Sequence, residues 1–196
     1  FEENVLENLP EEEAKEAIWK YAEIYRTKID NAGVDKLWNL TRGDPLYIYA
    51  LFSSYHNAKK DYDREDNVIE VYTQEIKSGL IFKTWGEYLA GVFLEANERD
   101  AKRIMLYLFQ AGKERTRARI IKDLKLVITD SELKTKLQKL IKADLISYGS
   151  TASRYVIAKD KTYELLFRRL FQKEIDNSVP DIRKELSREM GGNAAL

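Results

Sequence analysis

Cysteine is absent from the 196 residues, and histidine occurs only once, as His56. Without cysteine the chain has no disulfide, no thiolate metal site and no cysteine nucleophile. A single histidine forms no histidine cluster for a metal, so we expect no metal site. No apolar run approaches the roughly 18–20 residues that a membrane span needs. We therefore expect no membrane partner and a cytoplasmic location, with which the lack of cysteine agrees.

Charge is abundant but unevenly distributed. The chain is 44% hydrophobic and 34% charged, a composition typical of a compact, helix-rich protein. The formal net charge is zero, yet residues 1–100 hold 12 Lys/Arg against 21 Asp/Glu, and residues 101–159 hold 14 against 5. Residues 160–196 hold 7 of each sign. This segregation indicates an acidic region followed by a basic module.

The acidic region has a helical pattern throughout. Apolar residues at helical spacing predict helices over 10–29, 34–41, 45–56, 67–79 and 83–96, with an exposed loop over 57–66. Pro10 and three glutamates favour the start of the first helix. Asp44 and Pro45 favour the start of the third. The tryptophans Trp19, Trp38 and Trp85 are expected in the core.

The basic module combines three helices with a hairpin. The pattern predicts helices over 100–112, 116–126 and 129–145, and the last opens with a capping box at Thr129 and Glu132. Alternation around a Gly-Ser-Thr-Ala turn predicts a β-hairpin over 146–158. Helix returns over 160–175, and Pro180 opens a final polar helix. Three helices and a hairpin in this order are typical of a winged helix, a helix-turn-helix variant.

The third helix of this module has two different faces. Leucines 133, 137 and 140 form an apolar stripe, whereas hydrogen-bonding and cationic side chains lie opposite it. Such a face suits the major groove or phosphates of double-stranded DNA. The alternative is a winged helix that serves only in protein contact or as a rigid spacer, with a lysine-rich face that is simply solvated. The residues predicted to contact nucleic acid are Arg117, Arg119, Thr135, Gln138, Lys139, Lys142 and Arg154.

The first half carries a short motif with a family resemblance. The phrase Leu9-Pro10, followed by acidic residues and alanine, precedes the segment Gly43-Asp44-Pro45-Leu46, and a winged helix comes next. This order resembles the helical lid and winged helix of P-loop ATPases of the archaeal and STAND type, within the AAA+ group. The resemblance covers roughly residues 1–175. It implies that Pro45 packs near an adenine and that Gly43 allows close backbone approach, with Arg42 as the nearest cation.

The resemblance sets expectations for the organisation of the chain. We expect a mainly α fold: a lid-like helical domain at 1–97, a winged-helix domain at 98–175, and a linker or the start of a further segment at 176–196. No G-x-x-x-x-G-K-[ST] motif occurs. We therefore interpret the chain as a fragment without cofactor or catalysis of its own. ATP and magnesium are expected in the full-length protein, whose ATPase core would be a partner of this part.

Two alternatives remain open from the sequence. On physical grounds alone, Gly43-Asp44-Pro45 is an ordinary helix junction whose neighbouring apolar residues belong to the core. The chain as a whole also fits a second function, that of a winged-helix transcriptional regulator. Its acidic helices would then serve only in oligomerisation.

Overall fold

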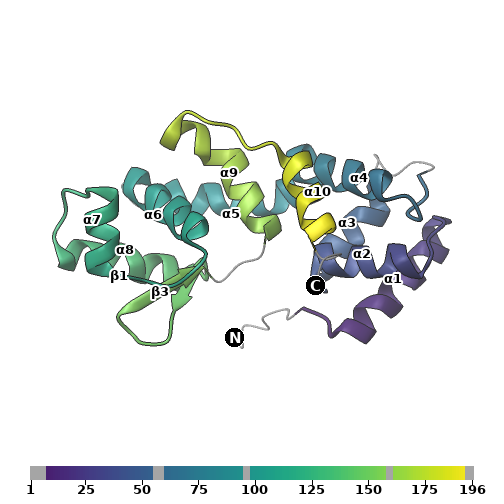
Figure 1. Ribbon diagram of the computed structural model, residues 1–196, viewed down its shortest axis with the longest axis horizontal. Helices are drawn as coiled ribbons and strands as arrows, with labels where there is room; N and C mark the ends of the chain where they lie inside the picture. The colour runs from purple at the N-terminus through teal and green to yellow at the C-terminus, as the bar shows by residue number, and fades with distance from the viewer. Residues whose placement is uncertain (1–7, 55–59, 95–97, 158–160, 193–196) are drawn as a thin grey trace. The chain divides into compact units, whose positions relative to one another are not determined.

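A computed structural model describes residues 8–54, 60–94, 98–157 and 161–192, which are mainly helical with one small antiparallel sheet (Figure 1). The predicted mainly α fold is therefore confirmed. His56 and part of the predicted loop over 57–66 lie outside the described residues. The chain divides into two compact units, which we call unit 1 (Phe1–Thr84 with Asp181–Leu196) and unit 2 (Trp85–Pro180).

This division differs from the predicted boundaries at both ends. Helix α5 (Leu80–Leu94) runs through the division, whereas the sequence pattern placed a boundary at residue 97. Helix α10 (Ile182–Gly192) contacts α2 and α4 of unit 1, where a linker or further segment was expected. The physical reason is burial: Ile182 and Leu186 are almost completely inaccessible to solvent.

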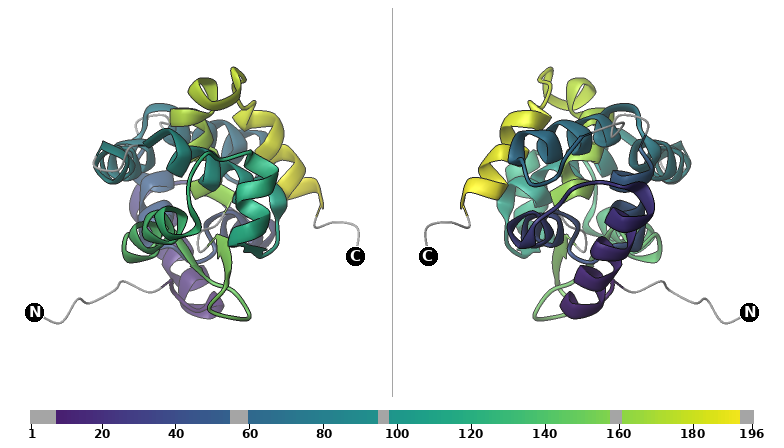
Figure 2. Two further views of the ribbon diagram at one scale, coloured as in Figure 1. Left: turned by 90° about the vertical axis from the view of Figure 1, so that its left-hand side faces the viewer. Right: turned by 90° about the vertical axis from the view of Figure 1, so that its right-hand side faces the viewer.

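Unit 1 is a bundle of short helices. In Figure 1 and Figure 2, α10 lies beside α4, and α1 lies beside α2 and α3, as their contacts also show. Buried residues of several helices form its core, among them Ile18, Leu37, Leu51 and Tyr72. Besides α10 and the start of α5, the helices of unit 1 are α1 (Glu11–Tyr25), α2 (Asn31–Thr41), α3 (Pro45–Ser53) and α4 (Glu65–Ser78).

Local sequence signals explain where these helices begin and end. Glutamates 11–13 occupy the first turn of α1, where the helix dipole favours negative charge. Arg26 ends α1 in the left-handed region with φ 53°. The Asp30 carboxylate caps α2 by accepting a hydrogen bond from the Gly33 N–H at 2.7 Å. The helices therefore start close to the positions that the sequence predicts.

Unit 2 joins helices to a three-stranded sheet. The strand order is β1-β3-β2, and both pairings are antiparallel. Tyr148 pairs with Tyr155 in the predicted hairpin, and Thr116 pairs with Arg154 in the other ladder. After the second part of α5, the elements are α6 (Glu98–Ala111), β1 (Arg115–Thr116), α7 (Arg117–Leu124), α8 (Asp130–Lys142), β2 (Ile146–Tyr148), β3 (Arg154–Ile157) and α9 (Lys161–Asp176).

The core of unit 2 gathers residues from all of these helices and from the hairpin. Helix α8 contributes the predicted leucine stripe, because Leu133, Leu137 and Leu140 are all buried. They belong to one cluster with residues of α5, α6, α7, α9, β2 and β3, including Phe93, Ile104, Leu108, Ile120, Ile146, Tyr155 and Phe167. This packing fixes which face of α8 remains exposed.

Candidate functional site

The junction between α2 and α3 contains the motif that resembles the ATPase lid. Arg42 and Gly43 both have positive φ angles, 52° and 79°, which end α2 and turn the chain. The Asp44 carboxylate then caps α3 by accepting hydrogen bonds from the N–H groups of Leu46 at 2.8 Å and Tyr47 at 3.1 Å. Pro45 is the first residue of α3, a position that suits proline. The predicted helix start is therefore present.

Gly43 is in close contact with the segment before α1. The Leu9 N–H donates to the Gly43 carbonyl at 2.9 Å. A Cβ atom on Gly43 would lie only 2.2 Å from the Leu9 carbonyl oxygen and 2.8 Å from the Trp38 ring. The Asn8 amide donates to the Arg42 carbonyl at 3.1 Å. Leu9, which also belongs to unit 1, therefore makes the close backbone approach that Gly43 permits.

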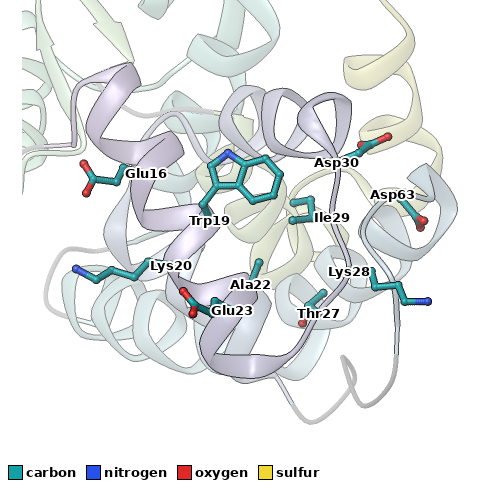
Figure 3. Close-up of a pocket in the computed structure, with 10 residues that line it drawn as sticks. All are labelled: Glu16, Trp19, Lys20, Ala22, Glu23, Thr27, Lys28, Ile29, Asp30 and Asp63. Carbon is teal, nitrogen blue, oxygen red and sulfur yellow. The ribbon is translucent and has the colours of Figure 1, made fainter.

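A cavity of about 810 Å³ lies elsewhere in unit 1. Figure 3 shows the Trp19 indole beside Ile29, with Lys20 and Lys28 pointing outward on either side. Trp19 is 43% exposed, so its predicted place in the core is wrong. The residues that line the cavity are Glu16, Trp19, Lys20, Ala22, Glu23, Thr27, Lys28, Ile29, Asp30 and Asp63, which do not include the predicted cofactor residues Arg42, Gly43 and Pro45.

The exposed face of α8 carries four of the residues predicted to contact nucleic acid. Thr135, Gln138, Lys139 and Lys142 are all exposed. The Thr135 hydroxyl donates to the Ser131 carbonyl at 3.1 Å. The predicted capping box is confirmed, because the Thr129 hydroxyl accepts from the Glu132 N–H while the Glu132 carboxylate accepts from the Thr129 N–H at 2.7 Å. This bonding lowers the pKa of Glu132.

The two predicted arginines at the start of α7 bind carboxylates of the chain itself. Arg117 Nε donates to Asp130 at 2.8 Å, and its Nη1 donates to the Tyr155 hydroxyl at 3.2 Å. Both hydrogen bonds raise the pKa of Arg117, the Asp130 bond more strongly. Arg119 Nε donates to Asp123 at 2.7 Å. Arg117 therefore connects α7, α8 and β3, a linkage that no sequence pattern indicated.

The hairpin residue Arg154 is more accessible than Arg117. Its side chain is 47% exposed and lies 4.0 Å from the Glu114 carboxylate. The same carboxylate accepts hydrogen bonds from the Ser150 N–H at 2.7 Å and the Ser150 hydroxyl at 3.0 Å. These bonds, with the Ser150 N–H foremost, lower the pKa of Glu114. Glu114 thus holds the turn of the hairpin while the guanidinium of Arg154 reaches solvent.

A second cavity, in unit 2, involves residues that sequence reasoning missed. It measures about 450 Å³ and brings Lys139 and Lys142 together with Lys136 and Tyr88. The Tyr88 hydroxyl donates to the Ala143 carbonyl at the end of α8. The spacing of the lysines along α8 was visible in the sequence. Their proximity to Tyr88 was not, because the two lie 48 or more residues apart along the chain.

The part of the chain that the structure describes contains neither a cluster of metal ligands nor a membrane-spanning helix. Residues 8–54, 60–94, 98–157 and 161–192 contain no group of three or more His, Cys, Asp or Glu side chains placed to hold a metal ion. Within the same ranges, no helix has the length and apolarity to cross a membrane. The chain matches no protein-family model, and no curated protein shows significant similarity to it.

Proposed function

We propose that the chain is the helical-lid and winged-helix portion of a P-loop ATPase of the archaeal and STAND type. In this proposal unit 1 is the lid, and unit 2 transmits the nucleotide state of the ATPase core to a partner. The support is the order of the elements along the chain. A helical unit containing Gly43-Asp44-Pro45-Leu46 at the start of α3 precedes a unit in which helices α6, α7 and α8 are followed by a hairpin.

Unit 2 supports the winged-helix assignment through its topology. Helix α6, strand β1, helices α7 and α8, and then the hairpin of β2 and β3 follow one another. Strand β3 lies between β1 and β2. In helix-turn-helix proteins, the second helix of the motif contacts the major groove. By position that helix is α8, with the hairpin as the wing.

The single observation that carries the choice of partner is the exposed face of α8. We propose that this face binds double-stranded DNA. Lys139 and Lys142 supply positive charge beside the hydrogen-bonding side chains of Thr135 and Gln138, and Arg154 adds a cation on the hairpin. The hydrogen bonds of Arg117 to Asp130 and Tyr155 suit positioning of α7 against α8 and β3 better than contact with phosphate. Arg119 bonds to Asp123 of its own helix and stays 60% exposed, so it is kept among the proposed DNA contacts.

A second function is favoured by one specific observation. Contact with Leu9 accounts for glycine at position 43 without any nucleotide. The alternative is therefore a winged-helix transcriptional regulator in which unit 1 serves in oligomerisation. Both functions use α8 in the same way, but only the first requires a nucleotide near Pro45.

The experiment that separates the two functions replaces Pro45 in a longer protein that joins this chain to a P-loop core. Pro45→Ala should weaken ATP binding there, because the half-buried ring would lose its contact with the adenine. Pro10→Ala is the matched control, since Pro10 is exposed at the start of α1. Equal ATP affinity in both variants and the wild type would contradict the lid assignment.

The chain alone should show no magnesium-dependent ATP hydrolysis. Turnover that persists through purification would also contradict the lid assignment.

A further inference from the structure

The cavity in unit 2 has an apolar floor and a cationic edge. Helices α5, α6 and α8 all contribute to it, and its volume of about 450 Å³ falls within the range of small-molecule sites. Phe93, Ala101 and Leu140 are buried parts of its lining. The complete lining is Tyr88, Val92, Phe93, Ala101, Lys136, Lys139, Leu140, Lys142 and Ala143.

The cationic edge consists of three lysines on one helix. Lys136, Lys139 and Lys142 follow one another at intervals of three residues, so each step along α8 advances by about 4.5 Å. Lys136 is half-buried, whereas the other two are exposed. Among the described residues that line this cavity there is no carboxylate. Two carboxylates act on this lining from outside it: Glu132 interacts electrostatically with Lys136, and Asp144 with Tyr88. Three lysines against these two carboxylates leave the edge net positive, so it attracts negative charge beside the apolar floor.

We propose that this cavity binds a small anionic amphiphile, a molecule with a carboxylate or phosphate head and an apolar body. The head would lie against the lysines, and the body would cover Val92, Phe93 and Leu140. Burial of apolar area supplies most of the binding free energy for such a ligand, and the charged head sets its orientation. The concave floor, built from three helices, and the single cationic edge match a molecule that is charged at one end only.

Binding at this site would also regulate the proposed DNA contact, a part of the inference that rests on the proposed function. Lys139 and Lys142 belong both to the cavity and to the face of α8 that we assign to DNA. An anionic head beside these lysines neutralises the charge that phosphates would otherwise use. A bound amphiphile should therefore weaken DNA binding.

The first experiment measures ligand binding without DNA. Decanoate, kept below its critical micelle concentration, should bind the intact chain with one-to-one stoichiometry in isothermal titration calorimetry. Lys136→Gln should raise its Kd about fivefold, the effect of losing one partly exposed charge pair. Lys134→Gln is the matched control, because Lys134 is an exposed lysine of α8 outside the cavity. Equal effects of the two variants, or no saturable binding to the wild type, would overturn the proposal.

A second pair of measurements tests the apolar floor and the charged head separately. Val92→Trp should abolish decanoate binding by filling the cavity, provided that its thermal melt stays cooperative. If that variant does not fold, Ala143→Leu, which enlarges another residue of the lining, serves the same purpose. Decanol, which lacks the charge, should bind at least fivefold more weakly than decanoate. Undiminished binding to a folded filled variant, or equal binding of decanol, would overturn the site.

The final measurement adds a short labelled DNA duplex. Saturating decanoate should weaken duplex binding by the wild type and leave binding by the filled variant unchanged. If the duplex does not bind but decanoate does, the proposed DNA function fails and the ligand site stands. If the duplex binds and decanoate does not, the ligand site fails alone. Tighter binding of an acidic, apolar peptide than of decanoate would also overturn the small-molecule assignment.

Discussion

The backbone at Gly43 combines a positive φ of 79° with a neighbour that leaves no space for a side chain. Residues other than glycine pay a conformational cost in this region, and here the Leu9 carbonyl adds a steric clash. The sequence indicated the junction because glycine, aspartate and proline stand together. It did not indicate Leu9, because that contact joins residues 34 positions apart and has no local signal.

Gly43→Ala should therefore lower the free energy of unfolding of unit 1 by at least about 2 kcal/mol. The matched control is Gly91→Ala in α5, where an added Cβ meets nothing within 4 Å. That substitution should stabilise the chain by up to about 1 kcal/mol, because alanine favours the helix interior. Urea denaturation of both variants tests the comparison. Equal effects would show that the contact with Leu9 does not constrain position 43.

At the scale of single elements, the sequence predicts the features of unit 2 that depend on local spacing and misses those that depend on distant partners. The leucine stripe and the capping box follow from local spacing, and both are present. Strand β1 was not predicted, because two residues carry no alternation pattern; of its residues, Thr116 was expected to begin the helix over 116–126. Its pairing with β3 supplies the missing information. The partners of Arg117 are also distant along the chain, so its hydrogen bonds to Asp130 and Tyr155 have no local sequence signal.

The capping box makes the stability of unit 2 depend on pH. The pKa of Glu132 is lower in the folded state than its ordinary value near 4.5, because its carboxylate accepts hydrogen bonds from Thr129. Because the folded-state pKa is lowered, the ionised carboxylate stabilises the fold at pH values above its ordinary pKa. This stabilisation is lost as the pH falls through the folded-state pKa. Glu132→Gln should therefore destabilise the chain more at about pH 7 than at about pH 3.

Urea midpoints at the two pH values measure this difference. Glu87→Gln in α5 is the control, because it also removes one exposed carboxylate from unit 2 but no helix cap. A destabilisation by Glu132→Gln that is the same at both pH values would contradict a role for the ionised carboxylate in the cap.

At the scale of the whole molecule, the chain returns to unit 1 after completing unit 2. The sequence predicts a final polar helix but not its place, because two buried side chains in a polar segment give a weak pattern. Ile182 and Leu186 are nevertheless 2% and 1% exposed. The segregation of charge is the other large-scale feature, and the sequence shows it directly. The basic module coincides with much of unit 2, which is why we propose the DNA contact for that unit.

Leu186→Ala should lower the free energy of unfolding of unit 1 by about 2–5 kcal/mol, the usual cost of a leucine truncated in a core. Arg188→Ala, at an exposed position of the same helix, should change it by no more than about 0.5 kcal/mol. Fluorescence of Trp19 and Trp38 in a Trp85→Phe background follows unit 1 selectively. If both substitutions have the same small effect, α10 does not contribute to the stability of unit 1.

The salt dependence of duplex DNA binding tests the central claim most directly. Four phosphate contacts predict a slope of about −3.6 for log affinity against log salt. The side chains proposed to make them are Arg119, Lys139, Lys142 and Arg154. Replacing Lys139 and Lys142 together by alanine should flatten that slope by about 2, and replacing the exposed Lys77 and Lys83 should leave it unchanged. Binding with these slopes supports α8 as the DNA-contacting helix. No binding at about 50 mM salt, or the same slope in both double variants, would contradict it.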